Sequence, residues 1–158
     1  MHLPQLDTVS PKLASVLRIS AAIGAAVLLA GAIGAEAVLA TLRWPVPGVV
    51  LTVWLAYAIW SIGLRPPRLM RAWGWRLDDN DFHVAGGVLF RTHTIVPLAR
   101  IQHIDVAQGP IERAYGVATL IVHTAGFEST AVALPGLLTD QAGEMRDAIR
   151  TRMMVPPE

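Results

Sequence analysis

The sequence predicts an α+β protein: an N-terminal two-helix transmembrane hairpin, followed by an antiparallel β-roll that a C-terminal α-helix caps. Three observations predict this class: an apolar excess confined to residues 1–64, short alternating runs from residue 65 onward, and one amphipathic stretch near the end. Of the 158 residues, 53% are hydrophobic and 16% are charged, against about 25% charged residues in an average soluble domain. This composition excludes intrinsic disorder, which requires low hydrophobicity and high charge.

The ionisable and sulfur-containing residues exclude several function classes. The formal net charge is +1, without the clustered basic surface that nucleic-acid binding needs. The chain has no cysteine, which excludes disulfides, thiol catalysis and zinc sites built from cysteine. The sequence also lacks a nucleophile elbow, a P-loop, a dinucleotide fingerprint and an HExxH motif. We therefore expect no catalytic residues and no cofactor.

The first half of the chain contains two long apolar stretches. Apart from Glu36, no charge occurs from residue 19 to 42, and none occurs from residue 44 to 64. A bilayer core needs about 20 apolar residues per helix. We expect a hairpin over residues 19–64 with spans at about 19–42 and 46–64, and a turn around Pro45 and Pro47. The alternatives are two buried helices of a soluble protein, or a signal peptide cleaved near Ala35.

Basic residues flank this hairpin on both sides. Residues 1–18, which contain Lys12 and Arg18, form the predicted N-terminal segment, and residues 65–76 form a basic juxtamembrane linker that runs into the first strand. The positive-inside rule then places both termini in the cytoplasm. The cluster after the hairpin consists of Arg65, Arg68, Arg71 and Arg76. Either it sets this topology alone, or in addition it holds the domain against anionic lipids of the inner leaflet.

Two further features lie within the spans. Small residues recur at four-residue spacing, which predicts a helix-packing stripe against the second span or against another membrane protein; they are Ala22, Ala26, Ala30 and Gly34. The carboxylate of Glu36 is a functional candidate because ionisable groups inside membranes are costly. Its position near the turn favours instead a solvated carboxylate, or one paired with Arg43.

The second half predicts six strands and a closing helix. The runs alternate or are β-branched, and Gly86-Gly87 suits a tight hairpin turn; the expected strands cover residues 73–77, 82–85, 88–96, 102–108, 117–124 and 130–134. A helix capped by Thr139 or Asp140 follows, and it places an apolar stripe on one face; the stripe is Ala142, Met145, Ile149 and Met153. The whole domain is expected over residues 73–153.

Several segments together resemble the YdbS-like bacterial pleckstrin-homology (PH) family, also called membrane-flanking domain proteins. The segments are Trp75-Arg76-Leu77, Gly87-Val88-Leu89, Val96-Pro97-Leu98-Ala99-Arg100-Ile101-Gln102, Gly109-Pro110-Ile111-Glu112-Arg113-Ala114-Tyr115-Gly116 and Thr124-Ala125-Gly126. The resemblance implies a PH-like split barrel of roughly seven strands at the inner face of a bacterial cytoplasmic membrane. It also singles out the family-motif residues Pro97, Arg100, Ile101, Gln102, Gly109, Pro110, Glu112, Arg113, Gly116 and Gly126.

Two groups of residues suggest ligand chemistry. The first loop of many PH domains binds phosphoinositides through basic residues, but here residues 78–81 are acidic and would repel phosphate. Four histidines, at 83, 93, 103 and 123, lie on expected strands, and adjacent strands can bring two of them together. Zinc needs three or four converging ligands, so we expect strand histidines and no metal site.

The sequence therefore predicts a non-enzymatic, membrane-anchored PH-like module that acts as a protein-interaction scaffold. Its exposed sheet edge and the loops from Gln102 to Tyr115 would bind a membrane protein or a second copy of the chain. The alternative is an accessory protein that binds lipid or a small ligand at the membrane surface, in export or in envelope stress tolerance. No nucleic-acid partner is expected.

Overall fold

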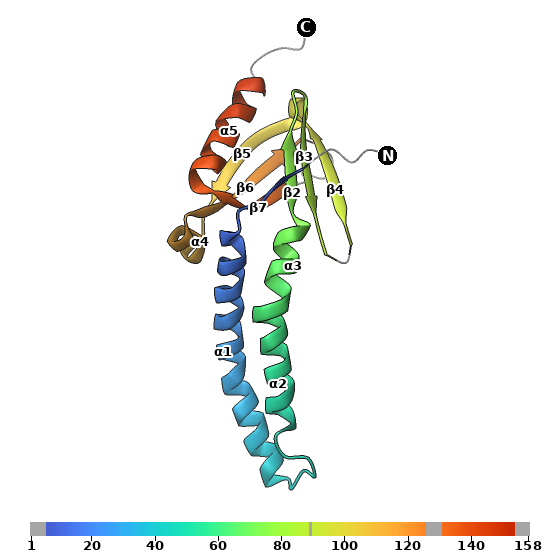
Figure 1. Ribbon diagram of the computed structural model, residues 1–158, viewed down its shortest axis with the longest axis vertical. Coiled ribbons are helices and arrows are strands. Elements are labelled where there is room, and N and C mark those ends of the chain that lie inside the picture. The colour runs from blue at the N-terminus through green and yellow to red at the C-terminus, as the bar shows by residue number, and fades with distance from the viewer. Residues whose placement is uncertain (1–5, 89, 126–130, 154–158) are drawn as a thin grey trace. The chain divides into compact units, whose positions relative to one another are not determined.

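The computed structural model describes residues 6–88, 90–125 and 131–153. The chain divides into two compact units: Ala14–Pro67 form one, and the residues before Ala14 join those from Arg68 onward in the other. The element order is helical through the first unit and mainly β-stranded in the second (Figure 1). The α+β class predicted from the sequence is confirmed.

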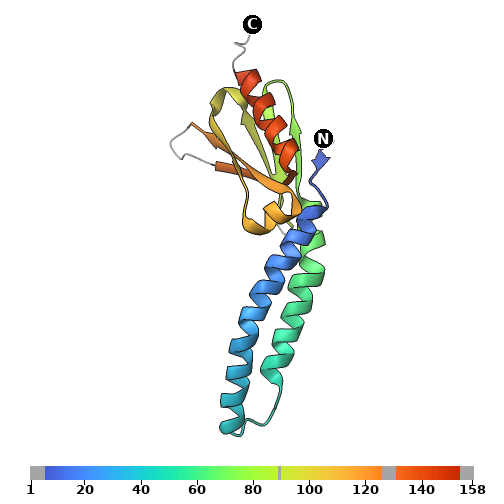
Figure 2. The ribbon, with the colours of Figure 1, turned by 90° about the vertical axis from the view of Figure 1, so that its left-hand side faces the viewer.

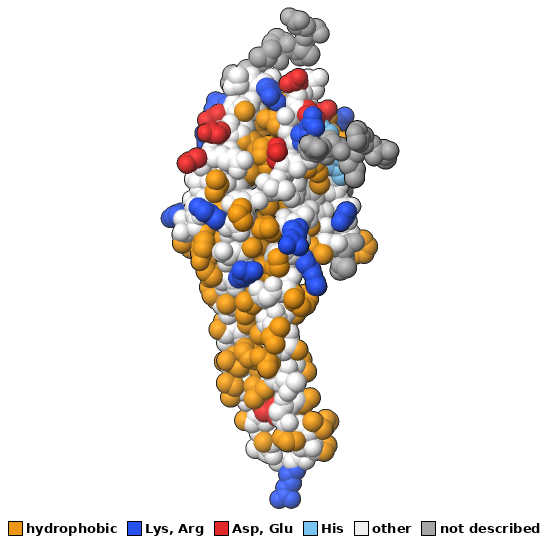
Figure 3. Space-filling model, in the orientation of Figure 1, with side chains coloured by type: hydrophobic (Ala, Val, Ile, Leu, Met, Phe, Trp, Pro, Cys, Tyr) orange, Lys and Arg blue, Asp and Glu red, His pale blue; other side chains and the backbone are white. Residues whose placement is uncertain are grey.

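The first unit is a helical hairpin. It consists of α1 (Lys12–Thr41), most of which lies in this unit, and α2 (Val49–Ile59), which leads into the π-helical turn η1 (Trp60–Leu64) and α3 (Arg65–Ala72). The helices Lys12–Thr41 and Val49–Ala72 are each long and apolar enough to cross a membrane. Hydrophobic side chains cover most of the visible hairpin surface (Figure 3). Val27 and Val53, for example, are about two-thirds exposed, at 70% and 65%, as expected of side chains that face lipid.

The second helix continues through Pro66 and Pro67 to Ala72, whereas the sequence predicts that the span ends at residue 64. A proline within a helix removes one backbone hydrogen bond and clashes with the preceding turn. Here the turn before Pro66 widens to the π-helix η1, which accommodates the ring, and the helix then continues as α3 to Ala72. Part of the expected basic linker is therefore helical.

The predicted helix-packing stripe does not face the second helix of the hairpin. All four of its residues are exposed, and a Cβ added to Gly34 would touch nothing within 4 Å. The buried positions of α1 within the hairpin include Ala25 and Ala32 instead. The indole Nε1 of Trp54 donates a hydrogen bond of 3.0 Å to the Ala25 carbonyl. Ala25 therefore lies on the side of α1 that contacts the second helix, and the stripe lies on exposed positions of α1, a detail that residue spacing alone does not encode.

Glu36 caps the second helix. Its two carboxylate oxygens accept hydrogen bonds from the backbone N–H groups of Gly48 and Val50, the latter at 3.1 Å. These N–H groups begin α2 and have no partner within the helix. Among the described residues no ion pair joins Glu36 to Arg43, so the expected pairing is not present.

The second unit contains two antiparallel sheets. Sheet A has the order β1 (Asp7–Thr8), β2 (Gly74–Leu77), β3 (Asp81–Gly86) and β4 (Thr92–Pro97). The β3–β4 connection spans residues 87–91, because Gly86 pairs with Thr92. The tight turn expected at Gly86-Gly87 is therefore replaced by a longer loop, in which Gly87 has φ +100° and a Cβ would strike the Phe90 carbonyl.

Sheet B has the order β5 (Ile101–Ala107), β6 (Val117–Thr124) and β7 (Ala131–Leu138). The 3₁₀ turn η2 (Leu98–Arg100) precedes β5, and the short helix α4 (Pro110–Tyr115) connects β5 to β6. The closing helix α5 (Thr139–Met153) packs on all three strands (Figures 1 and 2). Its buried residues are Ala142, Met145 and Ile149, whereas Met153 remains 38% exposed. The apolar stripe is thus confirmed except at its last position.

The chain before the hairpin closes this unit. Asp7 and Thr8 pair with Trp75 and Gly74 in sheet A, and the Ser10 N–H donates to the Gly136 carbonyl of β7 at 2.8 Å. Segment 6–13 therefore connects the two sheets and provides the seventh strand that the residue pattern does not reveal. The sequence predicts a separate N-terminal segment over residues 1–18, whereas in the structure residues 6–13 belong to the β-stranded unit.

Candidate functional site

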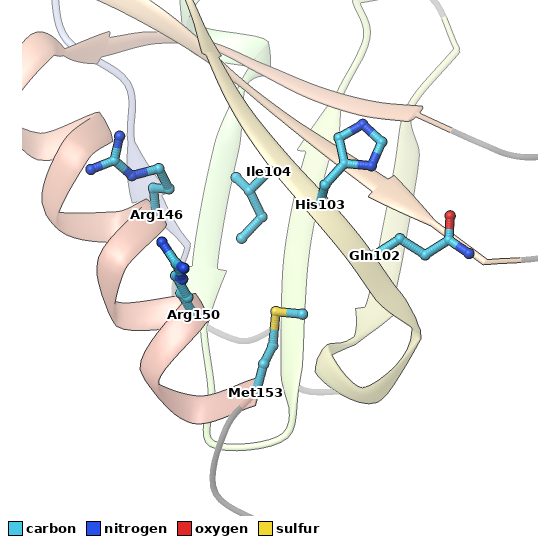
Figure 4. A pocket seen from close by; sticks show the side chains of 6 residues that line it. All are labelled: Gln102, His103, Ile104, Arg146, Arg150 and Met153. Carbon is cyan, nitrogen blue, oxygen red and sulfur yellow. The ribbon is translucent and has the colours of Figure 1, made fainter.

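A groove lies between β5 and the C-terminal helix α5. Its volume is about 430 Å³, and it is lined by Gln102, His103, Ile104, Arg146, Arg150 and Met153. In Figure 4, Ile104 and Met153 point toward each other across the gap, and the two arginines extend from α5. The floor is therefore apolar, and the rim carries polar and cationic groups.

The strand side of the groove is an unpaired sheet edge. β5 is the outermost strand of sheet B, where only β6 pairs with it. Within residues 90–125 and 131–153, as in the N-terminal part described, no strand pairs with its other side. An edge strand presents a row of backbone N–H and C=O groups that another extended segment can pair with. The groove thus combines hydrogen-bonding backbone with an apolar floor.

The helix side of the groove is positively charged. Arg146 and Arg150 lie one turn apart on α5, which places them on the same face. The guanidinium of Arg146 contacts the Asp147 carboxylate at 2.8 Å, whereas Arg150 has no ion pair among the described residues. Of the residues that the structure describes, no acidic side chain lines the groove. The site therefore favours an anionic group over a cationic one.

The family-motif residues build the turns at both ends of β5. Pro97 ends β4, Arg100 closes η2, and Ile101 and Gln102 begin β5, where Ile101 is buried. At the other end Gly109 and Pro110 start α4, and Gly116 ends it with φ +64°. Gly126 lies outside the described residues. These residues hold the groove strand in place, and Gln102 alone among them lines the groove.

One carboxylate of the motif joins α4 to sheet B. The Glu112 side chain accepts hydrogen bonds from the Gly109 N–H at 2.7 Å and from the Thr119 hydroxyl at 3.0 Å. Beside it, the Gln108 amide donates to the Val117 carbonyl at 2.8 Å and to the Thr139 hydroxyl at 3.0 Å. β5, β6 and the start of α5 are therefore fixed at one end of the groove.

The predicted basic cluster divides into two environments. Arg65, Arg68 and Arg71 are exposed at three-residue spacing along α3. Arg76 lies on β2, and its Nε contacts Asp78 at 2.6 Å. Three of the four arginines therefore remain accessible, and the fourth stabilises the acidic turn.

The four strand histidines form two pairs. His83 and His93 stack across β3 and β4 with ring centroids 5.4 Å apart. His103 and His123 stack across β5 and β6 at 4.0 Å, and Asp105 lies beside them. The expectation that adjacent strands bring histidines together is confirmed, and the structure adds the carboxylate.

The groove itself was not predicted as a site. In the sequence Arg146 and Arg150 are two polar positions of an amphipathic helix, where basic residues are common near the C-terminus. Their significance depends on the packing of α5 beside β5, which joins residues more than 40 positions apart. Only the unpaired edge and the segment from Gln102 onward were anticipated.

Comparisons with known proteins agree with this architecture. Residues 14–153 match the family described as Bacterial PH domain. The chain is 30% identical over 145 residues to the UPF0699 transmembrane protein YdbS of Bacillus subtilis (strain 168), and the alignment covers 90% of this chain and 89% of that protein. No solved structure matches the chain.

Proposed function

The chain belongs to the bacterial PH domain family, and from this premise we propose that it is a non-enzymatic, membrane-anchored module that binds an extended, acidic segment of a membrane-protein partner. The observation that carries the proposal is the groove between β5 and α5, where an unpaired strand edge adjoins two arginines. Strand addition to an exposed sheet edge is a common mode of peptide recognition.

Each side of the groove supplies a different part of recognition. The free edge of β5 offers backbone hydrogen bonds, which any extended segment can satisfy. Ile104 and Met153 offer apolar contact, and flexible methionine adapts to partners of varied shape. Arg146 and Arg150 select for carboxylates, to which arginine donates paired hydrogen bonds. An acidic, extended segment with apolar side chains matches all three.

The membrane anchor supports the same assignment. The relative YdbS is described as a transmembrane protein, and this chain has two apolar helices of sufficient length. We place both ends of the hairpin at the cytoplasmic face of a bacterial inner membrane. Segment 6–13 pairs with strands that follow the hairpin, which supports a topology with both flanks of the hairpin on the same side of the membrane. The basic residues around the hairpin favour the cytoplasmic side.

Anionic lipid is the second candidate ligand, favoured by the three exposed arginines of α3. Each basic group near an anionic leaflet contributes about 1 kcal/mol to association, and salt screens the attraction. The lipid role concerns α3, whereas the protein-binding role concerns β5 and α5. The two candidates therefore predict different sites of contact.

Photo-crosslinking in native membranes tests the proposal. A photoreactive amino acid replaces Gln102, an exposed residue of β5 at the border of the groove whose side chain extends on the side of β5 away from α5 (Figure 4), and in a matched control it replaces Ala133, which is exposed on β7. We expect a discrete protein adduct from position 102 and not from position 133. Arg150→Glu in the position-102 variant should remove the adduct, since it reverses the charge that attracts an acidic segment. Equal adducts at both positions, or adducts to lipid alone, would contradict the proposal.

A further inference from the structure

Three side chains with metal-binding atoms converge on the face of sheet B that is turned away from α5. His103 and Asp105 lie two residues apart on β5 and therefore share one face. His123 is the cross-strand partner of His103 on β6. Figure 4 shows the imidazole of His103 on the side of β5 away from α5. The cluster therefore borders the groove and shares His103 with it, whereas Asp105 and His123 do not line the groove.

The two distances from the Asp105 carboxylate to the histidine nitrogens are close to those around one shared ion. The Asp105 Oδ2 atom lies 3.2 Å from His123 Nε2 and 3.8 Å from His103 Nε2. One ligand atom from each of the three residues lies within 4.8 Å of the other two. Zinc binds nitrogen and oxygen at about 2.0–2.2 Å, so tetrahedral ligand atoms are about 3.3 Å apart. One of the two contacts already has this length, and the other exceeds it by only a few tenths of an ångström.

The backbone supports this convergence. The β5–β6 register shifts between Ile101 and His103, which indicates a bulge beside the histidine. Bulges re-aim a side chain and often lie next to functional sites. His103 and Asp105 are each 59% exposed and His123 is 32% exposed. An ion can therefore enter from solvent, and water can complete its coordination.

We propose that His103, Asp105 and His123 bind a divalent transition-metal ion such as Zn²⁺. Two imidazole nitrogens and one carboxylate form a ligand set that zinc uses with an open fourth position, whereas calcium and magnesium prefer oxygen ligands alone. The carboxylate also offsets part of the charge of the ion. Binding would join β5 to β6 beside the bulge and stiffen the strand that borders the groove.

The other histidine pair provides a matched control. His83 Nδ1 lies 3.3 Å from His93 Nε2, and His83 Nε2 lies 3.4 Å from Asp78 Oδ2. The two neighbours of His83 therefore approach different nitrogens on its ring, and no single ion can contact all three residues. Asp78 is also engaged by Arg76. Substitution of His93 removes a stacked strand histidine without removing a convergent ligand set.

Zinc titration of the full chain in detergent tests the site. The protein is purified without a histidine tag, treated with EDTA, and titrated with Zn²⁺ by calorimetry; Co²⁺ absorption reports the coordination. His2→Gln is included in every protein, because a histidine near the amino terminus also chelates metals. We expect one ion per chain, with weaker binding at lower pH because the imidazoles must be deprotonated.

Three substitutions separate the site from its surroundings. His123→Gln and Asp105→Asn should each weaken Zn²⁺ binding by roughly 10- to 100-fold or more. Loss of a residue that only supports a metal ligand already has an effect of this size, and these substitutions remove a ligand itself. His93→Gln should bind as the parent does. Asparagine preserves the shape of Asp105 and its ability to accept a hydrogen bond, and tryptophan fluorescence and melting temperature show whether each variant is folded. No binding by the parent, or unchanged binding in folded His123→Gln and Asp105→Asn proteins, would overturn the proposal.

Discussion

Gly136 is the position at which a single methyl group should disturb the closure of the β-stranded unit. It lies in β7 with φ +80°, and its carbonyl accepts the Ser10 N–H. A Cβ at this position would lie 2.6 Å from Leu13 Cδ2 and 2.9 Å from Leu13 Cβ. Leu13 is itself buried, at 3% exposure. The segment that precedes the hairpin therefore rests directly on this glycine.

The expected destabilisation by Gly136→Ala has two parts. An L-residue in a left-handed conformation costs about 1–2 kcal/mol. Overpacking of a buried contact adds about 1–3 kcal/mol. The free energy of unfolding should therefore fall by about 2–5 kcal/mol. Gly143→Ala is the matched control: a Cβ there meets nothing within 4 Å inside α5, so it should raise stability by about 0.5–1 kcal/mol.

Chemical denaturation of the full chain in detergent, followed by tryptophan fluorescence, measures both variants. The double variant Leu13→Ala/Gly136→Ala separates the two parts, because truncation of Leu13 removes the closest atom. The cost of Gly136→Ala should be smaller by about 1 kcal/mol or more in the Leu13→Ala background. If this cost is the same in both backgrounds, the contact between segment 6–13 and β7 does not act as described.

Three further outcomes follow from single side chains. Glu112→Ala should lower the unfolding free energy by about 1–3 kcal/mol, since two donors lose a charged acceptor, and denaturation midpoints measure it. Glu36→Ala should destabilise the hairpin by about 1 kcal/mol through loss of the α2 cap; a loss of helicity on heating, followed by circular dichroism, reports it, and Glu36→Gln should recover part of the effect. Trp75→Phe should leave stability unchanged or slightly raised, because the buried Trp75 Nε1 has no hydrogen-bond partner among the residues that the structure describes; a clear drop in melting temperature would contradict this reasoning.

Local patterns were sufficient to predict most of the fold. The β-branched residues of 117–124 indicate a strand and the stripe of α5 indicates a helix with one buried face, and both elements are present in the structure. β1 has only two residues and no period, and its partner β2 lies beyond the hairpin. No window of sequence contains both strands. The same holds for the rotation of α1, whose buried positions Ala25 and Ala32 depend on how it packs in the hairpin.

The candidate sites were harder to predict for a related reason. Each is assembled from residues on different elements: the groove from β5 and α5, and the histidine cluster from β5 and β6. The positions of the histidines suggested cross-strand pairs. Pairing alone does not predict that a carboxylate, that of Asp105, lies beside both histidines of one pair and that the other pair lacks such an arrangement. Register and the bulge at β5 decide that difference.

The pairing of β1 with β2 also constrains how the protein is made. A ribosome completes Asp7 and Thr8 long before Gly74 and Trp75, and the whole apolar hairpin is synthesised between them. Sheet A therefore cannot be completed until the hairpin has left the ribosome. A fragment that begins at Arg68 lacks this edge strand and the Leu13 contact with Gly136. A water-soluble form of the domain should instead join residues 6–13 directly to Arg68 through a flexible linker that replaces Ala14–Pro67.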